Sequence, residues 1–176
     1  MGTFPTKILL ATDGSDDAEV AATTSVDLAE STGSELHIVY VGPEVGERFE
    51  FSDTTSVLGP QVVIGKPSPE ERSRLEREAR DVLDQQVRKI EGLGGTVVRG
   101  HLRMGKPDAE ILSLAEELDA GLIVIGSRGL GGIRRALMGS VSGSVVRHAH
   151  CPVLIVRKKT LTSGSVKSER GAWEGE

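Results

Sequence analysis

The chain has 176 residues, a formal net charge of −5 and a sequence pI near 5.5. This acidic balance argues against nonspecific nucleic-acid binding, and the single cysteine excludes an intrachain disulfide. Every apolar run falls short of the roughly 20 residues that span a bilayer. We therefore expect a cytoplasmic protein that neither crosses a membrane nor binds nucleic acid.

The chain opens with an expected buried strand over residues 7–11 and a helix after the turn at residues 12–15. Aromatic residues make up only 3% of the chain, so the core must come from Val, Ile, Leu and Ala, as in parallel sheets. The helix is expected to begin at Ser15 or Asp16, with Asp16 and Glu19 at capping-box spacing. Its predicted stripe and end are formed by Val20, Thr24, Leu28 and Gly33.

Asp13 follows the first strand directly, at the end where parallel α/β sheets bind ligands. An Asp-Gly pair also caps many tight turns. From the pattern alone, Asp13 is therefore either a turn residue or a ligand contact, and both interpretations stay in play.

A second strand is expected over residues 36–41, with His37 as a packed side chain. Residues 42–67 show no hydrophobic period, which predicts an irregular loop that could either cover a site or simply connect two elements. A helix should start at Ser68, because serine, proline and glutamate occupy its cap, first and third positions. The third strand is predicted at residues 96–103, where its charges suit a sheet edge.

Two patterns imitate known sites. Residues 100–106 match the start of a Walker A loop, but Pro107 supplies neither a hydroxyl for magnesium nor an N–H for phosphate. Pro107 instead predicts the first turn of a helix. His148, His150 and Cys151 resemble zinc ligands, but no second cluster completes a set of four. We therefore expect neither a Walker A site nor a zinc site.

The stretch from residue 122 to 156 carries the main functional signal. Its apolar ends, residues 122–125 and 153–156, predict buried parallel strands. Between them, glycines precede a predicted helix whose first N–H groups and dipole attract anions. Ser140 is expected to cap this helix, to contact phosphate, or both. The residues of this pattern are Gly126, Gly129, Gly139 and Ser140, with Arg128, Arg134 and Arg135 nearby.

The glycine pattern has two interpretations. It indicates a phosphate site if the arginines offset anionic charge and the glycines admit a ligand. It is a flexible connection if the glycines serve only the chain path. The strand before it and the helix after it favour the phosphate site.

The spacing Gly126-x-x-Gly129-x(9)-Gly139-Ser140, flanked by LIVIGSRG and HAHCPVLIV, resembles the nucleotide-binding branch of the universal stress protein family. The resemblance extends from about Lys7 to Arg157 and includes the Gly-x-Pro start of the helix at Pro107. It implies an open, doubly wound α/β fold with a parallel five-stranded sheet of order 3-2-1-4-5 and helices on both faces. The first and fourth strands are then neighbours, as a shared ligand requires.

The resemblance also implies ATP as the ligand, together with Mg²⁺ or Mn²⁺, and a homodimer through the strand at Val153–Val156. That strand is uncharged, so a bare sheet edge there is unfavourable on physical grounds as well. Two alternatives are a cyclic-AMP sensor and a slow nucleotide hydrolase on the same fold. We expect a binding protein without catalytic residues, whose ligand contacts are Thr12, Asp13, Val41, Gly126, Arg128, Gly129, Gly139, Ser140 and Val141.

We expect one nucleotide-binding domain over residues 1–158. The remaining residues, 159–176, are rich in Ser, Gly and charge, which predicts a flexible tail.

Overall fold

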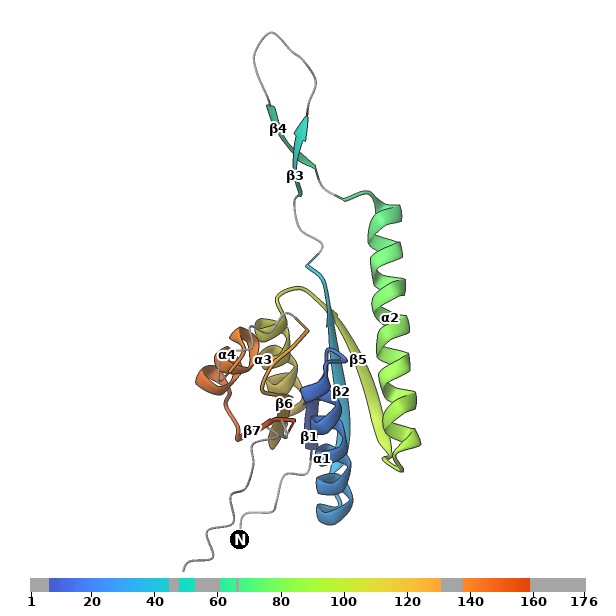
Figure 1. The fold of residues 1–176 in the computed structure, drawn as a ribbon, viewed down its shortest axis with the longest axis vertical. Coiled ribbons are helices and arrows are strands. Elements are labelled where there is room, and N and C mark those ends of the chain that lie inside the picture. Colours follow the sequence, from blue (N-terminus) through green and yellow to red (C-terminus); the bar gives the residue numbers. More distant parts are fainter. Residues whose placement is uncertain (1–6, 45–47, 53–60, 66, 131–137, 159–176) are drawn as a thin grey trace, which may run out of the picture.

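The computed structural model describes residues 7–44, 48–52, 61–65, 67–130 and 138–158. Strands and helices alternate along most of the chain (Figure 1). In chain order they are β1 (Lys7–Ala11), α1 (Asp16–Thr32), β2 (Glu35–Gly42), β3 (Arg48–Ser52), β4 (Gln61–Gly65), α2 (Pro69–Gly92), β5 (Val97–Met104), α3 (Pro107–Leu118), β6 (Leu122–Gly126), α4 (Ser140–His148) and β7 (Val153–Val156).

The main sheet has five parallel strands in the order β5-β2-β1-β6-β7. Numbered within this sheet alone, that order is 3-2-1-4-5, so the predicted topology is confirmed. β1 and β6 lie side by side at the centre, and Ala11 pairs with Ile125 at their carboxyl ends. The turns that follow these two strands therefore emerge next to each other, at the point where the winding changes direction.

Helices cover both faces of this sheet and close two apolar cores. Ile8, Leu10 and Ile38 face α1 and α2, where they pack with residues such as Leu83. On the other face, Leu9 and Val39 pack with residues of α3 and α4. This alternation along each strand explains why β1 and β2 read as almost continuous apolar runs: both of their faces are buried.

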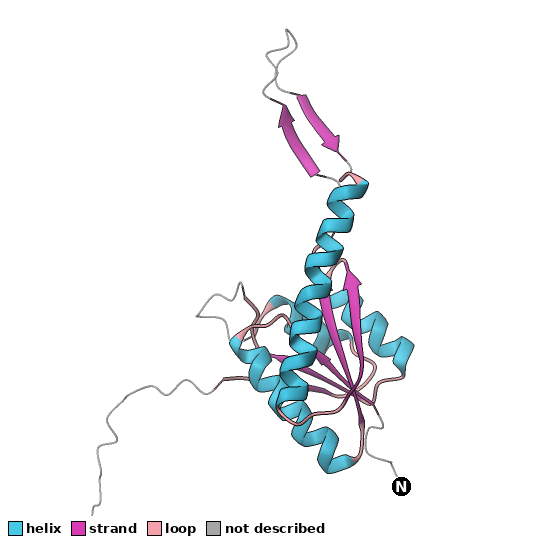
Figure 2. Cartoon of the chain, turned by 90° about the vertical axis from the view of Figure 1, so that its right-hand side faces the viewer, coloured by secondary structure: helices cyan, strands magenta, loops and turns pink. Residues whose placement is uncertain are grey.

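The prediction of an irregular loop over residues 42–67 was wrong in part. β2 continues to Gly42, and β3 and β4 form an antiparallel pair that projects from the sheet beyond the start of α2 (Figures 1 and 2). Five residue pairs join the two strands, from Arg48–Gly65 to Ser52–Gln61. A hairpin this short carries too few alternating residues to stand out from a polar sequence.

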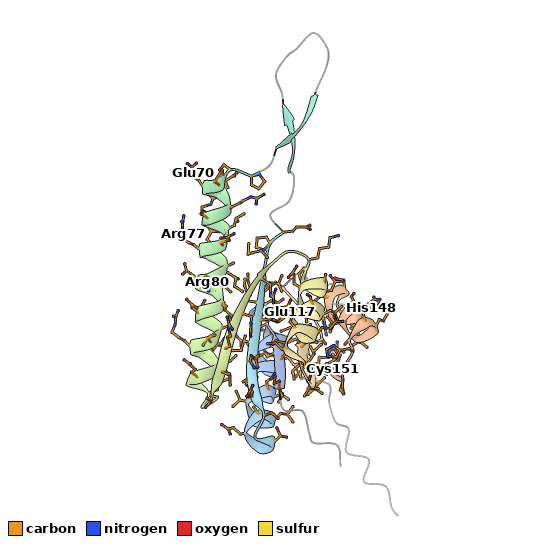
Figure 3. All side chains as sticks on the ribbon, turned by 180° about the vertical axis from the view of Figure 1, so that it is seen from behind. Glu70, Arg77, Arg80, Glu117, His148 and Cys151 are labelled. Atoms are coloured by element: carbon orange, nitrogen blue, oxygen red, sulfur yellow. The ribbon has the colours of Figure 1, made fainter. Side chains whose placement is uncertain are left out.

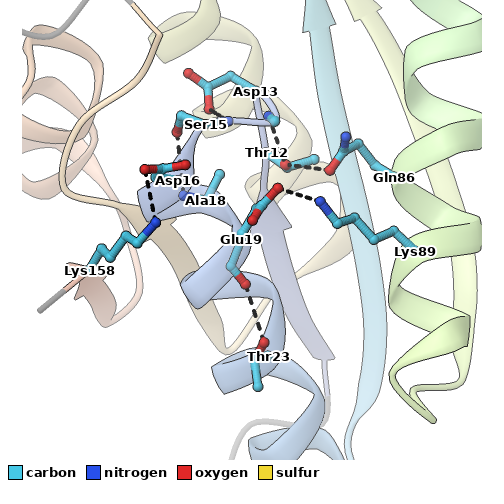
Figure 4. Close-up of polar contacts among 11 residues, drawn as sticks. Thr12, Asp13, Ser15, Asp16, Ala18, Glu19, Thr23, Gln86, Lys89 and Lys158 are labelled. Carbon is cyan, nitrogen blue, oxygen red and sulfur yellow. Dashed lines mark hydrogen bonds and ion pairs between the residues drawn. The ribbon is translucent and has the colours of Figure 1, made fainter.

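The helix caps are only partly as predicted. Ser68 and Glu71 form the expected capping box of α2. Ser15 caps α1 by accepting a hydrogen bond from Ala18, so the predicted pairing of Asp16 with Glu19 is wrong. In Figure 4, Glu19 instead reaches Lys89 of α2. The buried face of α1 also differs from the predicted stripe and consists mainly of Ala18, Ala21, Ala22, Ser25 and Val26.

α2 presents most of its length to solvent. Figure 3 shows Glu70, Arg77 and Arg80 on its outer side, where all three residues are exposed. Among the residues that the structure describes, no helix combines the length and the apolar character needed to cross a bilayer.

Candidate functional site

A cavity of about 500 Å³ lies at the carboxyl ends of β1, β2 and β6. The turn after β6 (residues 126–130, hereafter the β6 turn) and the first turns of α3 and α4 complete its walls. The sequence-predicted contacts all line this one cavity, although they come from four separate parts of the chain. They are Thr12, Asp13, Val41, Gly126, Arg128, Gly129, Gly139, Ser140 and Val141.

The wall formed by β1, β2 and α3 is apolar. Val39 and Val41 line it from β2, and Ala11 does so from β1. Pro107 and Ile111 close it from α3. Because these side chains belong to the core between the sheet and α3, this end of the cavity can take an uncharged, flat or apolar group without leaving polar atoms unpaired.

Asp13 links the first turn to the β6 turn. Its Oδ1 accepts a hydrogen bond from the backbone N–H of Ser15 at 3.0 Å, which Figure 4 shows. Its Oδ2 accepts one from the N–H of Leu130, also at 3.0 Å. The turn-cap interpretation of Asp13 is therefore confirmed, but the residue does more, because it fixes the far end of the β6 turn.

Gly126 and Gly129 are required by close packing. A Cβ at Gly126 would lie 2.9 Å from the backbone of Asp17 and Ala18, so α1 could not pack against β6. A Cβ at Gly129 would collide with the Asp13 carboxylate. Neither glycine has a positive φ, so close packing and not backbone conformation accounts for them.

Arg128 brings the positive charge of the β6 turn to the cavity. Its side chain lines the wall, and its Nε is buried without a hydrogen-bond partner among the described residues. A buried, unpaired N–H of a guanidinium is costly, so this atom is suited to an anion that enters the cavity. Arg134 and Arg135 lie outside the described residues.

The cap of α4 differs from the prediction. Gly139 is the cap residue and Ser140 is the first helical residue, so Ser140 does not cap the helix through its side chain. Ser142 supports this end instead, since its hydroxyl bonds the carbonyls of Ser127 and Gly139 at 2.9 and 3.2 Å. The N–H groups of the first turn of α4 have no intrahelical acceptor, and they lie where the cavity is lined by Ser140 and Val141.

A sequence profile of the Universal stress protein family matches residues 5–157. The chain belongs to the universal stress protein family. Universal stress protein YxiE of Bacillus subtilis is 35% identical over 153 residues, which cover 86% of this chain and 98% of YxiE. Two solved structures are also similar. That of MJ0577 from Methanocaldococcus jannaschii has a TM-score of 0.67 at 25% identity, covering 90% of this chain and 99% of that one.

The second is a universal stress protein from Archaeoglobus fulgidus in complex with dAMP, with a TM-score of 0.57 at 25% identity. It covers 88% of this chain and 99% of the other. The family prediction made from the glycine spacing is thus confirmed.

In this universal stress protein, sequence reasoning missed a buried pair beside the cavity. The hydroxyl of Ser127 donates to Asp17 Oδ2 at 2.6 Å, and the N–H of Lys158 donates to Oδ1 at 3.0 Å. Burial alone raises the pKa of Asp17, but these hydrogen bonds, with the charge and backbone N–H of Arg128, outweigh it and lower the pKa below its usual value. Asp17 is therefore a buried anion.

The Walker-like segment, residues 100–106, consists of the end of β5 and a short turn at Gly105, whose φ is 147°, and Pro107 then opens α3. Among the residues that the structure describes, no three His, Cys, Asp or Glu side chains come together as a metal site. Asp13 is the only carboxylate among the described residues of the cavity wall, so a cation there would need most of its ligands from a bound molecule.

Proposed function

We propose that this universal stress protein binds ATP, with a divalent cation, in the cavity at the carboxyl end of the sheet. The observation that carries the proposal is the division of this cavity into an apolar wall and a cationic mouth. An adenine ring suits the wall at Val39, Val41 and Ile111, and phosphates suit the mouth at α4 and Arg128.

The phosphate end combines two independent attractions for anions. The first turn of α4 offers backbone N–H groups and the positive end of a helix dipole. Arg128 adds a full charge and an N–H that lacks a partner among the described residues. Mg²⁺ or Mn²⁺ would arrive with the phosphates, and Asp13 is the carboxylate available to it. The dAMP complex of the Archaeoglobus fulgidus relative supports an adenine nucleotide.

Calorimetry with ATP, ADP, AMP and cyclic AMP tests this proposal, and mass spectrometry of the small molecule that co-purifies identifies the physiological ligand. We expect ATP to bind most tightly. Tighter binding of cyclic AMP would identify a cyclic-nucleotide sensor instead. No affinity for any of the four at millimolar concentration would refute nucleotide binding altogether.

Gly129→Val tests the location of the site. The new side chain collides with the Asp13 carboxylate, which holds Leu130, so the β6 turn must move. We expect ATP affinity to fall at least about tenfold, roughly 1.4 kcal/mol, with little change in the melting temperature of the free protein. Gly92→Val is the control, because a Cβ at Gly92 meets nothing within 4 Å. Unchanged binding in Gly129→Val would move the site elsewhere.

We infer that ATP is held rather than turned over. Hydrolysis needs a group that orients or deprotonates the attacking water, usually a carboxylate, Gln or His. Among the described residues of the wall, only Asp13 is of this kind, and its oxygens already bond Ser15 and Leu130. Phosphate release at saturating ATP and Mg²⁺ should stay far below about 1 s⁻¹. Faster turnover that disappears in Asp13→Asn would identify an enzyme.

The same proposal includes a homodimer formed along β7. Among the described residues, this strand is the outermost of the sheet on its side and pairs only with β6, and it carries no charge from Val153 to Val156. Two copies related by a two-fold axis would cover both edges at once.

A further inference from the structure

We propose that Asp17 is a positioning residue for the ligand: it holds the start of the β6 turn so that Arg128 faces the phosphates. The inference rests on the nucleotide binding proposed above. It concerns a residue of α1 that does not itself line the cavity.

Asp17 is the meeting point of three elements. The residue is only 9% exposed, and its carboxylate accepts hydrogen bonds from the Ser127 hydroxyl just after β6 and from the Lys158 N–H just after β7. The residue lies in the first turn of α1, which packs on Gly126 so closely that even a methyl group at Gly126 would not fit. The carboxylate thus fixes the position of the backbone at Ser127, where the chain leaves β6.

Ser127 passes this constraint to the other side of the cavity. Its N–H donates to the carbonyl of Val156 at 2.7 Å, and its carbonyl accepts the N–H of Gly139 at 2.8 Å. The hydroxyl of Ser142 donates to the same carbonyl at 2.9 Å. Every polar group of Ser127 is therefore engaged, and the residue joins Asp17 to the cap of α4, where the phosphates are proposed to bind.

Arg128 is held from both sides. Its carbonyl accepts the Ser15 hydroxyl at 3.1 Å, while its backbone N–H and its charge both stabilise the Asp17 carboxylate. The Arg128 Nε has no partner among the described residues, and the Asp17 carboxylate interacts favourably with the charge of this arginine before a ligand enters. When phosphate binds, the guanidinium gains a partner from a position that is already fixed, which lowers the cost of ordering it.

The alternating residues Asp13, Ser15 and Asp17 then act together. Asp13 holds the Leu130 N–H, Ser15 holds the Arg128 carbonyl, and Asp17 holds the Ser127 hydroxyl. The β6 turn is therefore held by residues 13–17, which lead into α1, and neither of its glycines, at 126 or 129, has a positive φ.

Calorimetry with ATP and with adenosine on Asp17→Asn tests the role. Asparagine keeps the shape but removes the charge, so Arg128 loses its fixed position. We expect ATP affinity to fall about tenfold, with adenosine affinity changed less than about twofold. If Asp17 acted only as a nearby negative charge that repels the phosphates, its removal would instead increase the affinity for ATP.

Asp16→Asn is the matched control. Asp16 is the adjacent residue and also interacts with Lys158, but through the exposed Nζ, as Figure 4 shows. This variant loses the same charge without touching Ser127, so both affinities should stay at the wild-type values. A loss of ATP affinity in Asp16→Asn equal to that in Asp17→Asn would overturn the positioning role.

Two further variants make the outcome unambiguous. In an Arg128→Gln background, the effect of Asp17→Asn on ATP affinity should shrink below about twofold, because there is no longer a guanidinium to position.

If Asp17→Asn does not fold, Ser127→Ala tests the same role, since it removes one donor and leaves the carboxylate its Lys158 partner. Equal losses for ATP and adenosine in the folded variant would refute positioning. Absence of ATP binding in the wild-type protein would refute the proposed function itself.

Discussion

The two edge strands of the main sheet, β5 and β7, differ in length and in charge, although both leave one side of the sheet without a neighbouring strand. β5 has eight residues and places Arg99, His101 and Arg103 on the face towards α3, opposite His37, Val39 and Val41 of β2. β7 has four residues, none charged, and all are half-buried. Charge on an edge strand opposes pairing with another chain, and an apolar edge invites it. This difference supports the proposal that a second copy of the chain covers the β7 edge and not the β5 edge.

The largest effect is expected at β7. Ile123 donates to the Pro152 carbonyl and Ser127 to that of Val156, so the alternation of a parallel ladder directs the N–H of Ile155 away from β6. Ile155→Pro removes this outward N–H while leaving the β6 pairing intact. We expect the dimer dissociation constant to rise at least about 100-fold, measured by light scattering and sedimentation.

Ile155→Val is the control for this experiment, since it keeps the N–H and nearly the same apolar surface and should remain dimeric. Melting curves of the two variants establish that both are folded. A wild-type protein that is monomeric at micromolar concentration would show that β7 is protected in another way, and the contrast between the edges would fail.

The same edges show what the sequence can predict. β7 and the central strands were recognised because short, β-branched apolar runs have few alternatives in an α/β chain. The edge position of β5 followed from the charges at Arg99 and Arg103, which a strand buried on both faces cannot accommodate. The nine predicted contacts came from the family resemblance, four of them directly from its glycine spacing, and the topology brings all nine to one cavity.

The features that the sequence analysis missed carry no comparable apolar run or motif. The buried face of α1 is made largely of Ala21, Ala22 and Ser25, which are too small or too polar to form a hydrophobic stripe. The Asp17–Ser127 hydrogen bond joins residues 110 positions apart, and no local pattern reports a contact between two polar residues at that distance. Charged residues are buried only when paired, so the partner must be known before the burial can be inferred.

A smaller effect, dependent on pH, is expected at β5. His101 lies against His37, with 3.1 Å between Nε2 and Nδ1, and Glu35 is 3.4 Å from the other ring nitrogen of His37. Burial is the main cause that lowers the pKa of His101 to about 4. The neighbouring His37, Arg99 and Arg103 lower this pKa further, and Glu117 opposes them.

Because the pKa of His101 is lower in the folded state than in the unfolded state, protons bind the unfolded chain more readily. The contribution of His101 to the free energy of unfolding is therefore fully present above pH 6.5 and is lost as the pH falls towards 4. Below that pH, the folded state also binds the proton. After allowance for solvent screening, the loss is about 1–2 kcal/mol. Urea unfolding of the wild type and His101→Gln between pH 7 and 4 measures it.

His150→Gln, at an exposed imidazole near β7, is the control and should keep the wild-type pH dependence. If His101→Gln loses stability on acidification as steeply as the wild type, then the β5 edge is not the part of the molecule that titrates.

The smallest effect is expected for the ion pair between Arg103 of β5 and Glu117 of α3. Both side chains are accessible, at 29% and 51%, so solvent screens their attraction even though the hydrogen bond from Arg103 is the main cause that lowers the pKa of Glu117. Arg103→Gln should lower the melting temperature by only about 1–2 °C at low salt, and the difference should vanish in about 1 M NaCl. Because Arg99 and His101 still keep this edge polar, the variant should keep the oligomeric state of the wild type. Higher-order oligomers of Arg103→Gln, detected by light scattering, would mean that a single charge keeps β5 unpaired. A large loss of stability that persists at high salt would instead show that Arg103 holds the edge strand to α3, and β5 would then be protected by packing and not by charge.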